Sequence, residues 1–325
     1  MTSREQGVAL LVVLLILSLM VTTAAAIAER NGRTFLRVVA QLDQLQAKWD
    51  AYAAESMAKQ ILQRDKLDSP RKTHLAQNWA QSERQFQTGR GDVRGQIVDA
   101  QACFNLNAIN YGAVDQANMP YAARIFQQLL INLKVESLQA GKVTAALRDW
   151  IDRDDKPVRG GAEDEAYMGM DPPYLAASQP MQDVSELRLI RGIDAGLYRK
   201  LLPYVCVVPA SDLSVNVNTL RDSQAPLMAA LFLTDPDSLS VMKLLQQRPR
   251  TGWDSVAAFL AVPQLKDTDT AAAIPVLAVN SNYFLVRLHV HSGEYLFSQQ
   301  NLMQWREDRF WSVQRQHGLT VSEGS

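Results

Sequence analysis

The sequence predicts an α+β protein: an N-terminal hydrophobic helix, then an antiparallel sheet that is interrupted by a large all-helical insertion. Three observations predict this fold. Residues 8–27 form an uninterrupted apolar run, hairpin-like and alternating segments occur at 84–102 and after residue 274, and helix-like sequence lies between them. Alternation with a period of two is typical of strands, whereas spacings of three and four are typical of helices.

The apolar run is twenty residues long and carries no charge. At about 1.5 Å per residue it would span about 30 Å, the thickness of a bilayer's hydrocarbon core. It has no polar face, since its polar residues are only Ser18, Thr22 and Thr23. We therefore expect residues 8–27 to cross a membrane.

Two kinds of processing are compatible with this run. The small residues Ala24–Ala26 could follow a secretory signal as its cleavage site. Gly7, however, lies at the amino-terminal edge of the run and helical sequence continues beyond it without a break. This arrangement favours cleavage before the run, which would leave it on the mature protein.

A stem helix is predicted to continue from residue 28 to residue 66, before the stop at Asp68-Ser69-Pro70. Large apolar residues recur along it at spacings of three and four, which places them on one helical face. We expect the carboxyl half of this face to pack on the protein's own domain. The residues are Phe35, Val38, Val39, Leu42, Leu45, Trp49, Tyr52, Met57, Ile61 and Leu62.

Composition excludes several classes of function. The 325 residues are 47% hydrophobic and 21% charged, which favours a folded core with room for a stem and about two domains. The net charge of −1 predicts no broad attraction to nucleic acid. The sequence contains no GxSxG, Walker or HExxH motif, so we expect no enzyme.

Cys103 and Cys206 are the two cysteines, and no CxxC motif occurs. One disulfide in an oxidising compartment is the simplest prediction, and two buried free thiols are the alternative. A disulfide between them would close a loop of about a hundred residues and would stabilise the fold by roughly 4–5 kcal/mol in the chain-entropy model.

An acidic loop follows the predicted helix that ends near residue 151. From Asp149 to Asp171 there are eight acidic and three basic residues, a net charge of −5. Hard cations such as calcium prefer such oxygen ligands, although the spacing is not that of an EF-hand. A calcium site and a solvated acidic loop are the two interpretations. The candidate ligands are Asp152, Asp154, Asp155, Glu163, Asp164 and Glu165.

Three further motifs have a structural and a functional interpretation. FNLN at 104–107 and VNVN at 215–218 favour tethering and capping over a binding groove. Short helices around Gly192, with a degenerate copy at 253–263, resemble a helix-hairpin-helix or SAM-like unit, but the surrounding acidity argues against phosphate binding. His289 and His291 are expected on an exposed sheet face rather than in a metal site.

The N-terminus resembles type IV prepilin-like proteins: a polar leader, residues 1–7, ends in Gly7 before an apolar helix. The resemblance implies that a prepilin peptidase cuts after Gly7 and methylates Val8. Most of these proteins carry Glu as the fifth residue after the cut, where this chain has Val12. A subunit with no partner ahead of it can dispense with that charge, so Val12 fits a position at a fibre tip.

Six motifs, in order, resemble the minor pseudopilin K family of type II secretion systems. The resemblance implies a leader at 1–7, a transmembrane segment at 8–27, a periplasmic stem at 28–66, a pilin-like sheet domain at 67–103 and 274–325, and an inserted helical domain at 104–273. The motifs are FNLN (104–107), DWIDRDD (149–155), GGAEDEAY (160–167), DPPY (171–174), SELRLIRGI (185–193) and VNVNTL (215–220).

The family resemblance also implies a function. It predicts a non-catalytic, single-pass protein of the bacterial inner membrane whose periplasmic domain caps a pseudopilus and helps to start its assembly. Its partners would be minor pseudopilins I and J, the major pseudopilin and the inner-membrane assembly platform, with no nucleic acid. The family binds calcium in its helical domain, which favours calcium at the acidic loop. The alternative is a membrane-anchored periplasmic factor that binds DNA through its hairpins.

Overall fold

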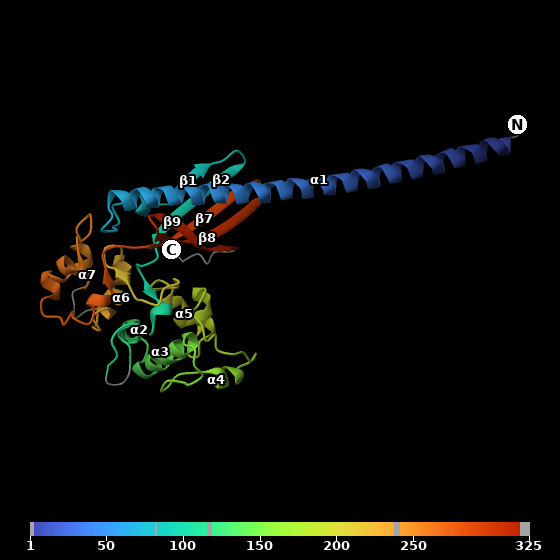
Figure 1. The fold of residues 1–325 in the computed structure, drawn as a ribbon. Helices are drawn as coiled ribbons and strands as arrows, with labels where there is room; N and C mark the ends of the chain where they lie inside the picture. The colour runs from blue at the N-terminus through green and yellow to red at the C-terminus, as the bar shows by residue number, and fades with distance from the viewer. Residues whose placement is uncertain (1–2, 82, 116–118, 237–240, 319–325) are drawn as a thin grey trace.

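The computed structural model describes residues 3–81, 83–115, 119–236 and 241–318. A single long helix, α1 (Ser3–Asp68), precedes everything else. Its amino-terminal half projects away from the rest of the molecule, and the sheet lies along its carboxyl-terminal half (Figure 1). The shorter helices gather beyond the sheet (Figure 1). The predicted combination of a long apolar helix with an antiparallel sheet is confirmed.

The sheet has five antiparallel strands in the order β1-β2-β7-β8-β9. Alternate residues of β7, from Phe284 to Val290, are buried under α1, whereas His289 and His291 lie on the other, exposed face. The predicted alternation is therefore confirmed. The strands are β1 (Arg84–Gln87), β2 (Gly91–Asp99), β7 (Tyr283–Ser292), β8 (Tyr295–Arg306) and β9 (Arg309–His317).

The face of α1 that packs on the sheet differs in part from the prediction. Small residues, Ala47, Ala51 and Ala58, are buried there together with Leu62. Large residues of the predicted stripe, from Phe35 to Trp49 and Met57, are mostly exposed instead. Alanine lets the helix axis approach the sheet closely, which large side chains would prevent. The exposed part of the stripe, residues 35–57, consequently does not pack on the protein's own domain, whereas Ile61 and Leu62 pack on the sheet as predicted.

The insertion between β2 and β7 has its own large hydrophobic core. It is not purely helical, because it contains two short pairs of parallel strands, β3 with β4 and β5 with β6. The expectation of an all-helical insertion is corrected in this respect: segments distant in sequence meet here through paired backbones. Its α-helices are α2 (Tyr121–Asn132), α3 (Ser137–Ile151), α4 (Asp164–Met168), α5 (Ala195–Leu201), α6 (Ala225–Ala230), α7 (Val241–Gln246) and α8 (Val256–Leu260).

Short elements complete the chain. The 3-10 helices, labelled η, are η1 (Asn78–Ala80), η2 (Leu106–Ala108), η3 (Val184–Leu189), η4 (Asp222–Gln224), η5 (Pro263–Leu265) and η6 (Ile274–Val276). The two-residue strands are β3 (Phe104–Asn105), β4 (Val205–Cys206), β5 (Val215–Asn216) and β6 (Leu277–Ala278).

Candidate functional site

The acidic loop brings three of its six candidate ligands together. One carboxylate oxygen each from Asp152, Asp154 and Glu163 lies within 4.8 Å of the other two. Asp152 is the residue that directly follows α3, and Glu163 is the residue that directly precedes α4. The two helices thus fix both ends of the loop, and the carboxylates converge between them.

The other three candidate ligands lie outside this cluster. Asp164 Oδ1 accepts a hydrogen bond from the Ala176 amide at 2.9 Å, which ties the start of α4 to the following loop. Asp155 and Glu165 are exposed. Sequence alone did not separate the two groups, since all six residues share the same acidic composition.

Glu163 and Asp152 each have one buried carboxylate oxygen without a hydrogen-bond partner in the described structure. Glu163 is only 7% exposed, and its Oε1, like Asp152 Oδ1, is buried without a hydrogen-bond partner in the described structure. Burial, together with the neighbouring carboxylates, raises the pKa of Asp152 to about 6 and that of Glu163 to about 7. Unpartnered carboxylate oxygens in a partly buried cluster fit a hard cation such as calcium.

Asp149 holds the acidic loop through hydrogen bonds to its backbone. Its carboxylate is fully buried and accepts hydrogen bonds from the backbone amides of Val158 at 3.1 Å and Ala162 at 2.8 Å. On the far side of Glu163, Tyr167 packs against Trp150 with ring centroids 5.2 Å apart. Residues on both sides of Glu163 are therefore anchored.

The FNLN motif tethers loops, as predicted. Asn105 donates to the Ala210 carbonyl at 2.7 Å and accepts from the Val208 amide at 3.1 Å. Asn107 both donates to the Met181 carbonyl at 3.0 Å and accepts from the Met181 amide at 2.7 Å. Two buried amides thereby pair with the backbone of loops 74 to 105 residues away, and no open groove is needed to explain them.

The VNVN motif repeats this arrangement. Asn218 donates to the Trp253 carbonyl at 3.0 Å and accepts from the Trp253 amide at 2.8 Å. Asn216 donates to Asp99 Oδ2 at 3.1 Å and to Ser281 Oγ at 2.7 Å. The second motif therefore connects the insertion to the ends of β2 and β7.

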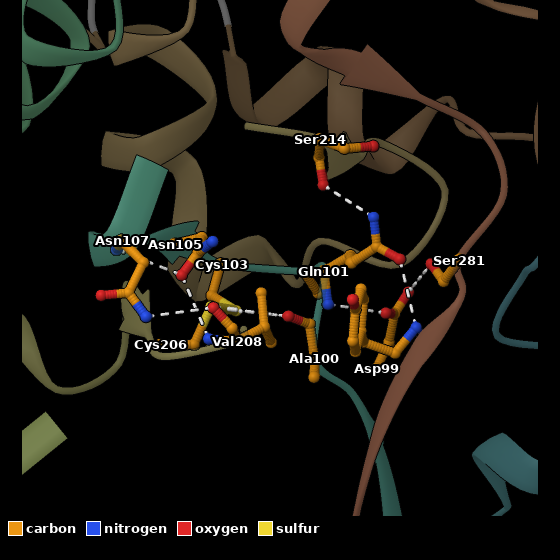
Figure 2. Close-up of a disulfide and its surroundings, with 12 residues drawn as sticks. Asp99, Ala100, Gln101, Cys103, Asn105, Asn107, Cys206, Val208, Ser214 and Ser281 are labelled. Atoms are coloured by element: carbon orange, nitrogen blue, oxygen red, sulfur yellow. Dashed lines mark hydrogen bonds between the residues drawn. A yellow bond between two sulfur atoms is a disulfide. The ribbon is translucent and has the colours of Figure 1, made fainter. Parts of the chain in front are cut away.

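The predicted disulfide is confirmed. Cys103 and Cys206 are joined, with their Cα atoms 5.8 Å apart. Cys103 directly precedes β3, and Cys206 lies in β4, the strand that pairs with β3. In Figure 2 the disulfide lies between Asn105 and Asn107 on one side and Asp99 on the other. It therefore reinforces the region where the insertion leaves the sheet.

Asp99 is a junction residue that the sequence analysis missed. It is buried and accepts hydrogen bonds from Ser281 Oγ and Thr219 Oγ1, both at 2.6 Å (Ser281 in Figure 2). Burial raises its pKa, and the hydrogen bonds from Ser281 and Thr219 oppose that rise. No sequence signal marks it, because one Asp at the end of a strand is unremarkable without its partners.

Two other motifs have structural contacts. In the tripeptide Arg90-Gly91-Asp92, at the turn between β1 and β2, Arg90 pairs with Asp43 at 2.9 Å and so connects the turn to α1. Asp92 pairs with Arg94 of the same strand at 3.3 Å. His289 Nδ1 lies 3.0 Å from Ser298 Oγ on the exposed face of the sheet. Both observations favour the structural interpretation of these residues.

The residues predicted for processing and assembly lie on the projecting part of α1. Gly7 and Val8 are within the helix, and the Val12 side chain is 51% exposed. From Val8 onward α1 is long and apolar enough to cross a membrane. Its most apolar stretch of 18 residues is not buried against the rest of the protein.

Comparison with known proteins agrees with this architecture. Two family models, both described as type II secretion system protein K, match residues 102–210 and 215–280. The type II secretion system protein K of Klebsiella pneumoniae is 52% identical over 320 residues and 98% of both chains, and that of Pectobacterium carotovorum subsp. carotovorum is 46% identical over 98% of both chains.

A solved structure shares the fold. A chain in the crystal structure of the GspK-GspI-GspJ complex from enterotoxigenic Escherichia coli matches with a TM-score of 0.80 and 35% identity, covering 87% of this chain and 100% of that one. Family models, full-length relatives and fold lead to one conclusion: this chain belongs to the type II secretion system protein K family.

Proposed function

We propose that this chain is a minor pseudopilin of a type II secretion system that assembles with the I and J minor pseudopilins. The observation that carries the proposal is the match, over 87% of the chain, to a protein solved in complex with GspI and GspJ. The outward-facing apolar stripe on α1 supports it, since neighbouring stems would cover that stripe. Its role is structural rather than catalytic.

The projecting half of α1 anchors the chain before assembly. Residues 8–27 would cross the inner membrane once, with the sheet and the insertion in the periplasm, where a disulfide is stable. A prepilin peptidase would remove residues 1–7 by cutting after Gly7 and methylate Val8. The same apolar helix would then leave the lipid and pack among other stems.

A position at the pseudopilus tip fits two features. Val12 brings no carboxylate that would need the amino terminus of a subunit ahead. The insertion also makes the periplasmic part much larger than a sheet and stem alone (Figure 1). From this position the chain would start assembly at the inner-membrane platform, and the major pseudopilin would extend the fibre below it.

The hairpin around Gly192 supports protein packing rather than DNA binding. Gln314 of β9 donates to the Gln182 carbonyl at 2.9 Å, and Gln316 donates to Asp183 Oδ2 at 3.0 Å. Asp183 precedes η3, the first helix of the hairpin. We infer that the η3–α5 pair forms a SAM-like unit that holds the insertion against the sheet, and that the α8–η5 pair forms a second such unit within the insertion.

Secretion tests the proposal in a cell. A strain that lacks the chain is expected to retain its type II substrates in the periplasm, and the intact chain is expected to restore their export. Normal export without the chain would contradict the proposal. Loss of DNA uptake with secretion unchanged would favour the DNA-binding alternative.

We also propose that the acidic loop binds calcium through Asp152, Asp154 and Glu163. A bound calcium ion would neutralise the converging carboxylates and so hold the end of α3 against the start of α4. The support is the cluster itself together with the unpartnered Glu163 Oε1 and Asp152 Oδ1.

Calorimetry tests the calcium proposal. Titration of the full chain in detergent with calcium chloride is expected to give binding that Glu163→Gln removes. Glu165→Gln is the matched control, because Glu165 is two residues away but exposed and outside the cluster. Equal titrations of the parent chain and Glu163→Gln would refute the ligand set.

A further inference from the structure

We propose that Asp149 is a positioning residue: its buried carboxylate folds the acidic loop before any cation arrives, without itself being a ligand. This inference rests on the proposed calcium site and extends it. That site has a second observation beyond its acidity, since Glu163 is only 7% exposed, its carboxylate belongs to the cluster, and its buried Oε1 has no hydrogen-bond partner in the described structure.

The location of Asp149 is unfavourable unless it has a specific task. It is fully buried in the last turn of α3, where the helix dipole disfavours a negative charge. Among the described residues, its carboxylate accepts hydrogen bonds from the backbone amides of Val158 and Ala162 rather than from a basic side chain. A buried carboxylate with both oxygens accepting backbone donors organises that backbone.

The backbone amides of Val158 and Ala162 fix the loop in its middle and next to the proposed ligand Glu163. Ala162 directly precedes Glu163, so its bond to Asp149 Oδ2 sets the approach of the Glu163 side chain to Asp152 and Asp154. Val158 holds the middle of the loop through Asp149 Oδ1. A turn with the Gly161 amide bonded to the Val158 carbonyl at 2.8 Å joins the two contacts.

Gly161 shows how closely the loop is drawn onto Asp149. A Cβ atom on Gly161 would overlap Asp149 Oδ2, so any other residue there would displace the carboxylate or the loop. Gly169, a few residues later, meets only ordinary contacts at 3.7 Å or more and has no positive φ. The two glycines offer matched Gly→Ala variants on either side of Glu163 in the sequence.

The geometry distinguishes this role from ligation. In the described structure Asp149 Oδ1 and Oδ2 are both occupied by backbone donors, whereas Asp152 and Glu163 each retain an unpartnered oxygen. Asp149 is also absent from the group whose oxygens converge within 4.8 Å. It therefore acts through the loop rather than through contact with the cation.

The test combines calcium titration with amide hydrogen exchange on the full chain in detergent. Asp149→Asn presents an amide to one of the two backbone donors, so it is expected to weaken calcium binding about tenfold or more. It is also expected to speed exchange at residues 158 and 162 in the calcium-free protein. Glu163→Gln is expected to abolish binding while leaving that exchange slow.

Gly161→Ala and Gly169→Ala complete the test. Gly161→Ala is expected to reproduce both effects of Asp149→Asn, and Gly169→Ala neither; unchanged exchange within α2 shows that each variant is folded. Calcium binding and loop exchange that stay at parental levels in folded Asp149→Asn would overturn the inference. If the parent chain itself binds no calcium, the calcium proposal fails, and this inference with it.

Discussion

At the scale of single residues, a buried acid sets how the stem sits on the sheet. Glu55 of α1 is 3% exposed and accepts two hydrogen bonds from Arg315 of β9, at 2.8 and 2.9 Å. Lys59 pairs with it at 2.8 Å, and Asn301 donates to it at 3.2 Å. The network fixes the position of α1 along the sheet and its rotation about its own axis. Apolar packing of alanines alone would define both less specifically.

Removing this charge is expected to destabilise the contact between stem and sheet. Glu55→Gln should lower the free energy of unfolding by about 2 kcal/mol near neutral pH, discounted because Arg315 and Lys59 are partly exposed. Chemical unfolding of the full chain in detergent measures this. The control is Glu29→Gln, which removes an exposed pair with Arg33 and should cost only a few tenths of a kcal/mol.

The same carboxylate gives the contact a pH dependence. Burial opposes ionisation of Glu55, but hydrogen bonds from Arg315 and Lys59 outweigh it and lower the pKa overall. The stabilisation is therefore complete above the pKa of an unfolded Glu and is lost as pH falls through the lowered folded pKa. The difference between the parent and Glu55→Gln should shrink in acid; a constant difference would contradict this account.

At the scale of elements, the sequence predicted those with strong periodicity. The β7 alternation from Phe284 to Val290 and the length of α1 follow directly from spacing. The packing face of α1 did not, because Ala47 and Ala51 carry little hydrophobic signal beside Leu45 and Trp49. Large apolar residues on a helix indicate a contact, but not whether its partner is the same chain.

The acidic loop shows a similar limit. Composition identified the segment, yet it could not separate Glu163 from Glu165, which lie two residues apart and differ in burial. The distinction arises from the turn that Asp149 and Gly161 hold, a contact between residues with no periodic relation. Sequence patterns describe repeating elements better than they describe loops closed by a buried side chain.

The Asn motifs should contribute as tethers. Asn107→Ala would leave the Met181 amide and two buried carbonyls, those of Met181 and Val208, without this partner. We expect a loss of roughly 2–4 kcal/mol in unfolding free energy. Asn110→Ala is the control, since exposed Asn110 has one surface contact with Arg148. Equal losses for the two variants would show that tethering by Asn107 is unimportant.

At the scale of the whole molecule, the sheet and the insertion are joined at one polar junction. Asp99 ends β2, Asn216 and Thr219 belong to the insertion, and Ser281 precedes β7. Lys66, at the end of α1, donates to the Ser281 carbonyl at 3.0 Å. One network of hydrogen bonds therefore joins the stem, the sheet and the insertion, so we expect the three parts to move together as one rigid unit.

The apolar character of Val12 should matter to the assembled machine. Val12→Glu would place a carboxylate in lipid with no amino terminus ahead of it, at a cost of up to about 3 kcal/mol. We expect weaker membrane insertion or pseudopilus assembly, measured as reduced export of type II substrates. Val12→Leu, the apolar control, should export normally. Full export by Val12→Glu would remove Val12 from the argument for a tip position.

The most direct test of the central claim is whether the chain forms a complex with its proposed partners. The full chain is co-expressed with the I and J minor pseudopilins of the same secretion system, purified in detergent and weighed by native mass spectrometry. The account predicts one species containing all three proteins. An isolated chain, with the I and J proteins found only without it, would contradict the account.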